Sequence, residues 1–139
     1  MPKLPLPPDA EELLTKPSAA VIATLRADGS PHTAVTWYAW EDGRVLVNMD
    51  ASRVRLKHLR RDSRVSLTVL DTATWYRQVT VFGRVVDLRQ DTDLADIDRL
   101  SLRYTRQPYR NRESPRVSAW IQVEGWYGWE NAGAWPPAG

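Results

Sequence analysis

The sequence contains no cysteine and only two histidines in 139 residues. The absence of cysteine excludes disulfide bonds, thiolate metal sites, iron–sulfur clusters and thiol catalysis. Two histidines are too few for most histidine-based metal sites, so we expect no metal centre. The longest apolar run, Ala19–Leu25, is far shorter than a membrane span, and the proline-rich N-terminus does not have the pattern of a signal peptide. We therefore expect a cytoplasmic protein with no membrane partner.

Familiar catalytic motifs are missing as well. No Gly-x-Ser-x-Gly elbow, His-Glu-x-x-His, P-loop or Gly-x-Gly-x-x-Gly occurs, and no acid/base pair stands out. If the chain is an enzyme, a bound cofactor would carry the reaction while the protein supplies position and electrostatics. A non-catalytic protein that binds or carries a cofactor is the alternative.

Charge is balanced overall but unevenly distributed. The chain has 19 Lys and Arg against 17 Asp and Glu, a net charge of +2. Its arginines concentrate in residues 53–64 and 99–116, and the intervening segment 87–98 is acidic. Two basic clusters on a small domain indicate an anionic partner. The nearly neutral total argues against nucleic acid as that partner.

Turn signals and periodicity predict a mainly β protein. Asp-Gly pairs at 28–29 and 42–43 predict two hairpins, and the three strands they join would form a meander. Helices are expected over residues 10–15, 52–61 and 94–104, capped by Asp9, Ser52 and Asp93. Strands are expected over residues 19–26, 31–40, 44–48, 65–70, 75–88 (bent at Gly83) and 117–123. These elements predict a closed, six-stranded antiparallel barrel of the α+β class, with helices covering its ends.

The segment Asn48–His58 follows a strand and opens a helix. A helix N-terminus offers unpaired N–H groups and a partial positive charge, which suit phosphate. Arg53 and Arg55 fall in or near its first turn, and a guanidinium can bind phosphate through two hydrogen bonds. A solvated helix face is the alternative, and we assign Arg60 and Arg61 to such a face.

Aromatic residues are plentiful, with seven Trp in the chain. Trp37, Tyr38 and Trp40 could stack on a planar ring, fill the core or lie at a subunit interface. Trp75 begins a strand directly after a loop, where pocket rims often lie. Four tryptophans near the C-terminus exceed the needs of one small barrel, and we expect some of them to be buried in a homodimer; they are Trp120, Trp126, Trp129 and Trp135. For the histidines we expect His32 at a rim and His58 packed or hydrogen-bonded.

Taken in order, these motifs resemble a known family. The pattern runs through Ile22-Ala23-Thr24-Leu25, Asp28-Gly29-x-Pro31-His32, Trp37-Tyr38, Arg53-x-Arg55-x-Lys57-His58-Leu59-Arg60-Arg61, Arg116-Val117 and Gly125-Trp126-Tyr127-Gly128-Trp129. Its order and spacing are similar to the FMN-binding split β-barrel superfamily, which includes pyridoxamine 5′-phosphate oxidases. The resemblance is strongest to the branch of actinobacterial deazaflavin (F420)-dependent oxidoreductases, which includes biliverdin reductases.

The resemblance implies a homodimeric, six-stranded split β-barrel with cofactor grooves at the subunit interface. It divides the chain into an N-terminal arm (residues 1–9), the cofactor-binding barrel (10–129) and a C-terminal tail (130–139). It implies an oxidoreductase that transfers a hydride from reduced coenzyme F420 to a small unsaturated organic or tetrapyrrole-like substrate. An FMN-dependent enzyme of the pyridoxamine-phosphate-oxidase type and a non-catalytic flavin-binding or deazaflavin-binding protein are the alternatives.

The resemblance also implies site residues. The family often has Lys where this chain has Arg55, which keeps the charge, and Asn where it has His58, which changes the local hydrogen bonding. The residues implied to hold the cofactor are His32, Thr33, Ala34, Val35, Thr36, Val47, Asn48, Met49, Ser52, Arg53, Arg55, Lys57 and Trp75. Those implied to reach the substrate or the cofactor tail are Arg106, Arg110, Arg112 and Arg116.

Overall fold

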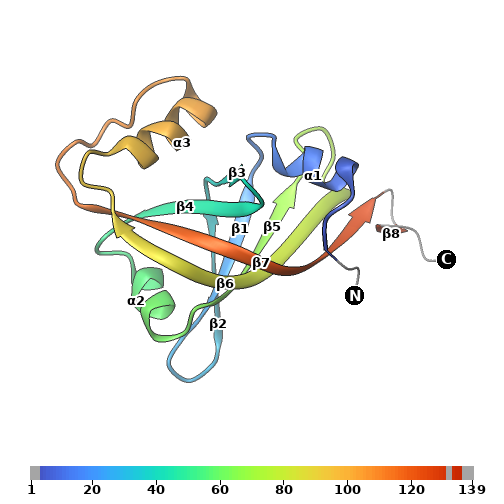
Figure 1. Cartoon of the computed structure of the whole chain (residues 1–139), viewed down its shortest axis with the longest axis horizontal. Helices are drawn as coiled ribbons and strands as arrows, with labels where there is room; N and C mark the ends of the chain where they lie inside the picture. Colours follow the sequence, from blue (N-terminus) through green and yellow to red (C-terminus); the bar gives the residue numbers. More distant parts are fainter. Residues whose placement is uncertain (1–3, 131–132, 136–139) are drawn as a thin grey trace.

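The computed structural model describes residues 4–130 and the backbone of residues 133–135 (Figure 1). In chain order the elements are α1 (Pro8–Leu14), β1 (Ala20–Leu25), β2 (Pro31–Thr36), β3 (Ala39–Glu41), β4 (Arg44–Asp50), α2 (Val54–Arg61), β5 (Arg64–Leu70), β6 (Arg77–Gln90), α3 (Ala95–Thr105), β7 (Arg116–Glu130) and β8 (Gly133–Trp135). Within the described residues, seven strands form one antiparallel sheet in the order β2-β1-β5-β6-β7-β4-β3, and β8 pairs with β7. No helix in this part of the chain is long and apolar enough to cross a membrane.

Both expected hairpins are present. In the β3–β4 turn, Asp42 and Gly43 have φ values of 52° and 74°, the left-handed pair that a tight hairpin turn requires. In the β1–β2 turn, Gly29 has a φ of 86°, and the Asp28 carboxylate accepts hydrogen bonds from the backbone N–H and hydroxyl of Ser30. Local turn chemistry therefore sets the register of both hairpins.

The connection between the two hairpins gives the sheet its curvature. β2 and β3 lie at opposite edges of the sheet, yet only Trp37 and Tyr38 separate them in the chain. The sheet must therefore curl until its two edges come close together. Among the described residues no ladder joins β2 to β3, so the barrel is split rather than closed.

The split β-barrel class is confirmed, but three details of the expectation are wrong. Seven strands lie along the sheet rather than six, because residues 31–40 divide into β2 and β3. The three-strand meander is absent, because β4 pairs with β7 and not with β2. The barrel is also not closed. All three differences begin at Tyr38, whose fully buried ring turns into the core while its hydroxyl donates to the carbonyls of Leu14 and Lys16, both at 2.9 Å.

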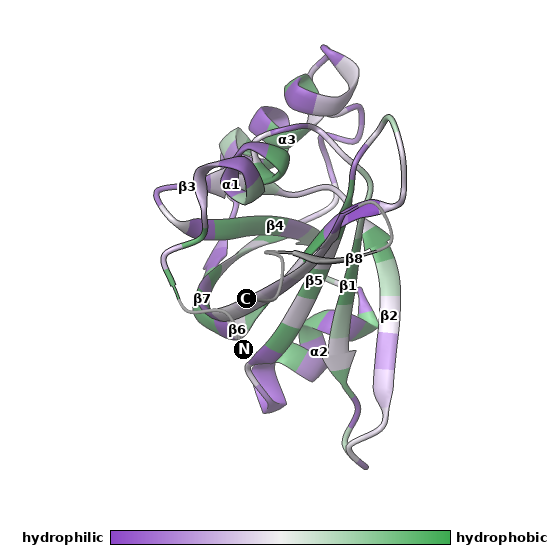
Figure 2. Ribbon diagram, turned by 90° about the vertical axis from the view of Figure 1, so that its right-hand side faces the viewer, coloured by the Kyte–Doolittle hydropathy of each residue, from purple (hydrophilic) through white to green (hydrophobic). Residues whose placement is uncertain are grey.

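The core lies between the inner faces of the strands and is covered at its ends by helices. Alternate residues of β1 are buried, and Leu13 and Leu14 of α1 and Leu56 and Leu59 of α2 join the same cluster. Burial of each such leucine contributes about 1.5–3 kcal/mol. Figure 2 shows β4 as predominantly hydrophobic, in keeping with its place between this core and a second cluster beneath α3.

The strands and caps also differ in detail from the expected ones. β7 continues unbroken from Arg116 to Glu130, and β6 stays continuous through Gly83, where its register against β7 shifts. A Cβ at Gly83 would clash with the carbonyl oxygen of Gln122, so the two strands approach closely there. Asp9 lies inside α1 rather than at its N-cap, and α2 has Arg53 at its N-cap in place of Ser52.

Two polar anchors fix α3, and with it the loop that leads to β7. At its start, the buried Asp91 carboxylate accepts hydrogen bonds from the backbone N–H groups of Asp96 and Ile97. Asp93 accepts a further one from Ala95, but the N-cap position itself is Leu94, so the prediction of Asp93 as the N-cap is wrong by one residue. At the other end, the Arg103 guanidinium donates to the carbonyls of Leu14, Thr15, Lys16 and Tyr38. In Figure 1, α3 lies above the long β6–β7 pair and α2 below it.

Candidate functional site

Two adjoining hollows, which share Arg55, form the candidate site. The first has a volume of about 450 Å³ and the second about 300 Å³. We refer to the two together as the groove. The first hollow is lined by His32, Ala34, Asp50, Ser52, Arg53, Val54 and Arg55, and the second by Val35, Thr36, Trp37, Asn48, Arg55, Tyr109 and Arg116.

Arg55 is the most unusual residue of the groove. The residue is only 9% exposed, and its buried Nε atom has no hydrogen-bond partner among the described residues. Burial, followed by the charges of Arg53 and Arg116, lowers the pKa of the Arg55 guanidinium. A buried cation with no counter-charge is costly in an isolated fold. An anion in the groove would supply both the missing charge and the missing acceptor.

The chain turns sharply just before Arg55. Asp50 ends β4, and its carboxylate accepts hydrogen bonds from the backbone N–H of Ser52 at 2.9 Å and from the Ser52 hydroxyl at 2.7 Å. These two bonds are the main reason that the pKa of Asp50 is lowered. Arg53 follows in extended conformation as the N-cap, and the helix then carries Arg55 into the groove. The turn therefore places two guanidinium groups at the start of α2.

Arg116 enters the groove from β7 and is held rigidly. Its Nε donates to Asn48 Oδ1 at 2.8 Å, and its Nη1 donates to the Tyr109 hydroxyl at 3.3 Å. The guanidinium carbon also lies 4.6 Å from the centre of the Tyr109 ring. Asn48 is fixed in turn, because its amide donates to Asp91 and Ser118. Arg53, Arg55 and Arg116 thus bring three cations to one groove.

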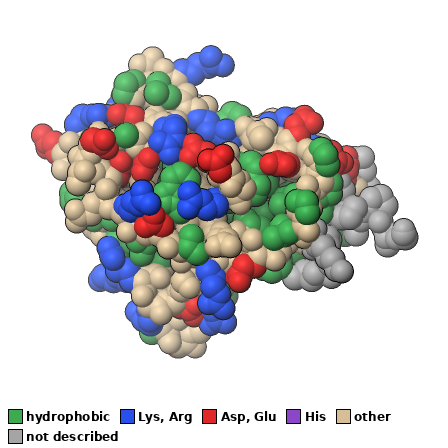
Figure 3. Space-filling view, viewed as in Figure 1, with side chains coloured by type: hydrophobic (Ala, Val, Ile, Leu, Met, Phe, Trp, Pro, Cys, Tyr) green, Lys and Arg blue, Asp and Glu red, His purple; other side chains and the backbone are tan. Residues whose placement is uncertain are grey.

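Ion pairs with acidic side chains distinguish several surface arginines from the three arginines of the groove. Arg99 binds Glu41 and Asp96, and Arg112 binds Asp98, so their charges are compensated. On the face shown in Figure 3, basic and acidic side chains lie beside one another rather than in separate patches. Among the described residues of the two basic clusters, Arg64, Arg99 and Arg112 are held in surface ion pairs, whereas Arg53, Arg55 and Arg116 lie in the groove without one.

The structure brings about half of the implied site residues together. Those lining the groove are His32, Ala34, Val35, Thr36, Asn48, Ser52, Arg53, Arg55 and Arg116. Val47 and Met49 belong to the hydrophobic core, because successive side chains of β4 point to opposite faces. Thr33, Lys57 and Trp75 are exposed outside the groove, and Trp75 stacks on Tyr76 with ring centres 4.2 Å apart.

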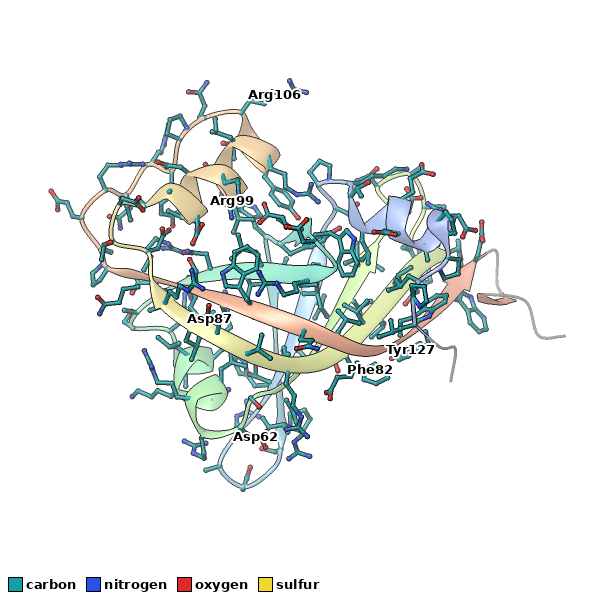
Figure 4. All side chains as sticks on the ribbon, in the orientation of Figure 1. Asp62, Phe82, Asp87, Arg99, Arg106 and Tyr127 are labelled. Atoms are coloured by element: carbon teal, nitrogen blue, oxygen red, sulfur yellow. The ribbon has the colours of Figure 1, made fainter. Side chains whose placement is uncertain are left out.

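The arginines of the α3–β7 loop also separate. Arg106 is the exposed C-cap of α3, and Figure 4 shows it at the outer end of the helix, away from the sheet. Arg110 lines a further hollow of about 470 Å³, which shares Trp37 and Tyr109 with the groove. Arg112 is held by Asp98. Of the four, only Arg116 reaches the groove in the single chain.

The aromatic wall of the groove consists of Trp37 and Tyr109, and the sequence analysis did not identify Tyr109. Trp37 stacks on Tyr104 with ring centres 5.4 Å apart, and it meets the ring of Tyr109 edge-on at 6.1 Å. Tyr109 had a usable signal, since it is the single aromatic residue in the polar segment 106–116. Tyr38 and Trp126 fill the core, and Trp120 is half-buried, so these aromatics have places within one chain. The side chain of Trp135 lies outside the described residues.

The two histidines fall where the sequence predicted. His32 is half-buried at the rim of the groove, and His58 is buried with its Nδ1 2.9 Å from the Thr24 hydroxyl. Burial is the main cause of the lowered pKa of His58, and the charges of His32, Arg26 and Arg61 add to it. The folded protein therefore keeps His58 neutral.

This burial predicts an acid-sensitive fold. Below about pH 6.5, the ordinary histidine value, the unfolded chain binds a proton that folded His58 resists, so stability falls as the pH decreases. We expect the melting temperature of the wild type, in anion-poor buffer, to fall between pH 7 and pH 5.5. The fall should be smaller in His58→Gln and unchanged in His32→Gln. Parallel curves for His58→Gln and the wild type would contradict this assignment.

Comparisons with known proteins agree with this fold and site. The family described as pyridoxamine 5′-phosphate oxidase matches residues 6–130. A solved structure described as an F420 reductase is 26% identical, covers 87% of this chain and 98% of its own, and superposes with a TM-score of 0.79. The conserved hypothetical protein Rv2991 from Mycobacterium tuberculosis is 24% identical, with coverages of 92% and 86% and a TM-score of 0.70. General Stress Protein 26 from Bacillus anthracis is 19% identical, with coverages of 86% and 90% and a TM-score of 0.67. No curated protein matches the chain.

Fold and groove together define a split β-barrel with an arginine-lined groove at the start of a helix. The chain belongs to the pyridoxamine 5′-phosphate oxidase family, because the family match spans most of its length. Within that family it resembles the F420-dependent branch.

Proposed function

We propose that the protein is an oxidoreductase that binds coenzyme F420 in the groove and reduces a small unsaturated organic or tetrapyrrole-like substrate. The observation that carries the proposal is the buried Arg55 guanidinium, which lacks a counter-charge and lies in one groove with Arg53 and Arg116. Reduced F420 would supply a hydride, a reaction that the protein's own side chains cannot provide. Similarity to the F420 reductase structure supports this choice of cofactor.

The groove residues would have different roles in binding. Arg53 and Arg55 would hold the anionic part of the cofactor at the start of α2. Arg116, fixed by Asn48 and Tyr109, would stabilise negative charge that develops further along the groove. Trp37 and Tyr109 would provide flat apolar walls for a planar group. The lowered pKa of Asp50 keeps its carboxylate ionised, so it would not act as a proton donor near neutral pH.

A direct test compares F420 with FMN. The family description favours FMN as the second candidate, since flavin and deazaflavin share the planar ring and an anionic chain. We expect fluorescence titration to give micromolar or tighter binding of F420, and weaker binding of FMN. Tight binding of FMN alone would overturn the choice of F420. Tight cofactor binding without turnover of quinones, enones or biliverdin would favour a carrier.

We also propose a homodimer, with the second copy docked on the outer face of the sheet. The buried residues of α1 and α2 pack against the inner face. Most outward positions along five neighbouring strands carry no charge, and the paired Arg64 and Arg84 are charged positions at one end of the face. The uncharged positions are Val21, Ala23, Leu25, Pro31, Thr33, Val35, Ser66, Thr68, Leu70, Gln78, Thr80, Phe82, Tyr127 and Trp129. Phe82 and Tyr127 lie together on this side in Figure 4, with ring centres 6.5 Å apart. A broad, largely uncharged sheet face of this kind supports burial against an identical face.

A further inference from the structure

The two histidines of the chain lie side by side at one end of the groove. Their ring centroids are 5.1 Å apart, and the rings meet edge-on at 74°. His32 comes from β2 and lines the first hollow together with Arg53 and Arg55. His58 comes from α2 and is only 4% exposed, so it lies behind His32 rather than in the groove.

His58 is held in place and uncharged. Its Nδ1 lies 2.9 Å from the hydroxyl of Thr24, the residue that pairs with His32 in the β1–β2 ladder. Because its pKa is lowered, mainly by burial, the His58 imidazole carries no charge at neutral pH. His32 therefore packs against a neutral, fixed neighbour.

The charges that face His32 depend on what occupies the hollow. Arg53 and Arg55 are two cations in the same hollow, so an anion that they bind there would have His32 as a neighbour. Asp50 is the carboxylate of the hollow, and both of its hydrogen bonds to Ser52 engage one oxygen, Oδ1. Arg26 and Arg61 lie on the His58 side. A bound anion next to His32 would favour a protonated imidazole.

We propose that His32 is a proton-linked anion ligand. When a sulfate or phosphate group binds beside Arg53 and Arg55, the His32 imidazole takes up one proton from solvent and donates a hydrogen bond to the anion. His58 is its positioning residue. The inference rests on the proposed function, because the same hollow is assigned there to the anionic part of the cofactor. By linkage, affinity for the anion rises as the pH falls.

Sulfate is the best probe, because its charge does not change between pH 5.5 and 8. We expect sulfate to bind about tenfold more tightly at pH 5.5 than at pH 8. A change of this size corresponds to the uptake of one proton by a group whose pKa rises by about one unit when sulfate binds. With only two histidines in the chain, NMR resolves each imidazole separately. Sulfate should protonate His32 near neutral pH and leave His58 neutral. F420 and FMN, measured over the same pH range, distinguish a phosphodiester from a phosphate monoester as the natural ligand.

Two substitutions separate the linkage from simple binding. His32→Gln should remove the pH dependence of sulfate affinity. Lys57→Gln, which removes an exposed charge from α2, the helix that carries Arg55, should keep it. Equal affinity at both pH values, an unprotonated His32 in the presence of sulfate, or no sulfate binding at all would overturn the proposal. If Arg55→Met weakens binding of sulfate and F420 but the sulfate affinity of the wild type does not change with pH, only the proton linkage is wrong. If Arg55→Met changes neither affinity, the proposed function fails too.

Discussion

Replacing Arg55 by methionine is expected to make the protein more stable and to weaken the proposed binding of F420. The substitution keeps most of the buried hydrocarbon chain and removes a guanidinium that has no counter-charge in the fold. Buried charges replaced by apolar groups of similar volume often stabilise a protein by ~1–4 kcal/mol. Loss of a charge-assisted contact of about 2–3 kcal/mol predicts a fall in affinity of about 100-fold.

The measurements are thermal unfolding without cofactor and fluorescence titration with F420. Lys57→Met is the matched control, since it removes a positive charge from the same helix at an exposed position outside the groove. It should change neither the melting temperature nor the affinity appreciably. An Arg55→Met protein that binds F420 as tightly as the wild type would remove the basis of the proposed function. Opposite changes in stability and affinity are the signature of a residue kept for binding rather than for folding.

A negative charge on the outer sheet face is expected to convert the proposed dimer into a monomer. Tyr127 is 52% exposed in the single chain, so Tyr127→Glu should fold normally. Across a two-fold axis each substitution occurs twice, and a desolvated carboxylate in an uncharged interface costs several kcal/mol. We expect the dissociation constant of the dimer to rise at least about 100-fold.

Sedimentation at micromolar concentration measures this effect. Leu102→Glu is the control, because Leu102 is 49% exposed and belongs to α3 rather than to the sheet. The control should remain dimeric. A wild-type protein that sediments only as a monomer would sink the dimer proposal and any groove completed by the second copy.

Most of the fold could be read from local patterns. The Asp-Gly pairs gave the two hairpins, and the spacing of leucines gave α2 and α3. The errors arose where a long-range contact overrides local periodicity. Residues 31–40 alternate like one strand, yet Tyr38 is drawn to the carbonyls of the α1–β1 connection and divides it. Nothing within residues 31–40 encodes that contact.

The sequence predicted which types of residue form the candidate site, but not which individual arginines lie in it. The sequence shows nineteen arginines and lysines across several clusters and identifies Arg53 and Arg55 by their place at a helix start. It does not show which of the remaining arginines have acidic partners. Arg112 and Arg116 are four residues apart, yet one binds Asp98 and the other enters the groove beside Asn48.

The sequence by itself determined a one-domain, mainly β chain with no thiol chemistry, two tight hairpins and a basic helix start. These properties depend on composition and on neighbours close in the chain, so they can be read directly. Only the tertiary structure decided that Arg55 is buried with no ion pair among the described residues, that Arg116 joins it from β7, and that His58 packs behind His32 at the rim of the groove. Burial and charge compensation depend on which distant strands become neighbours, and that is set when the curled sheet brings β2, β4 and β7 around one groove.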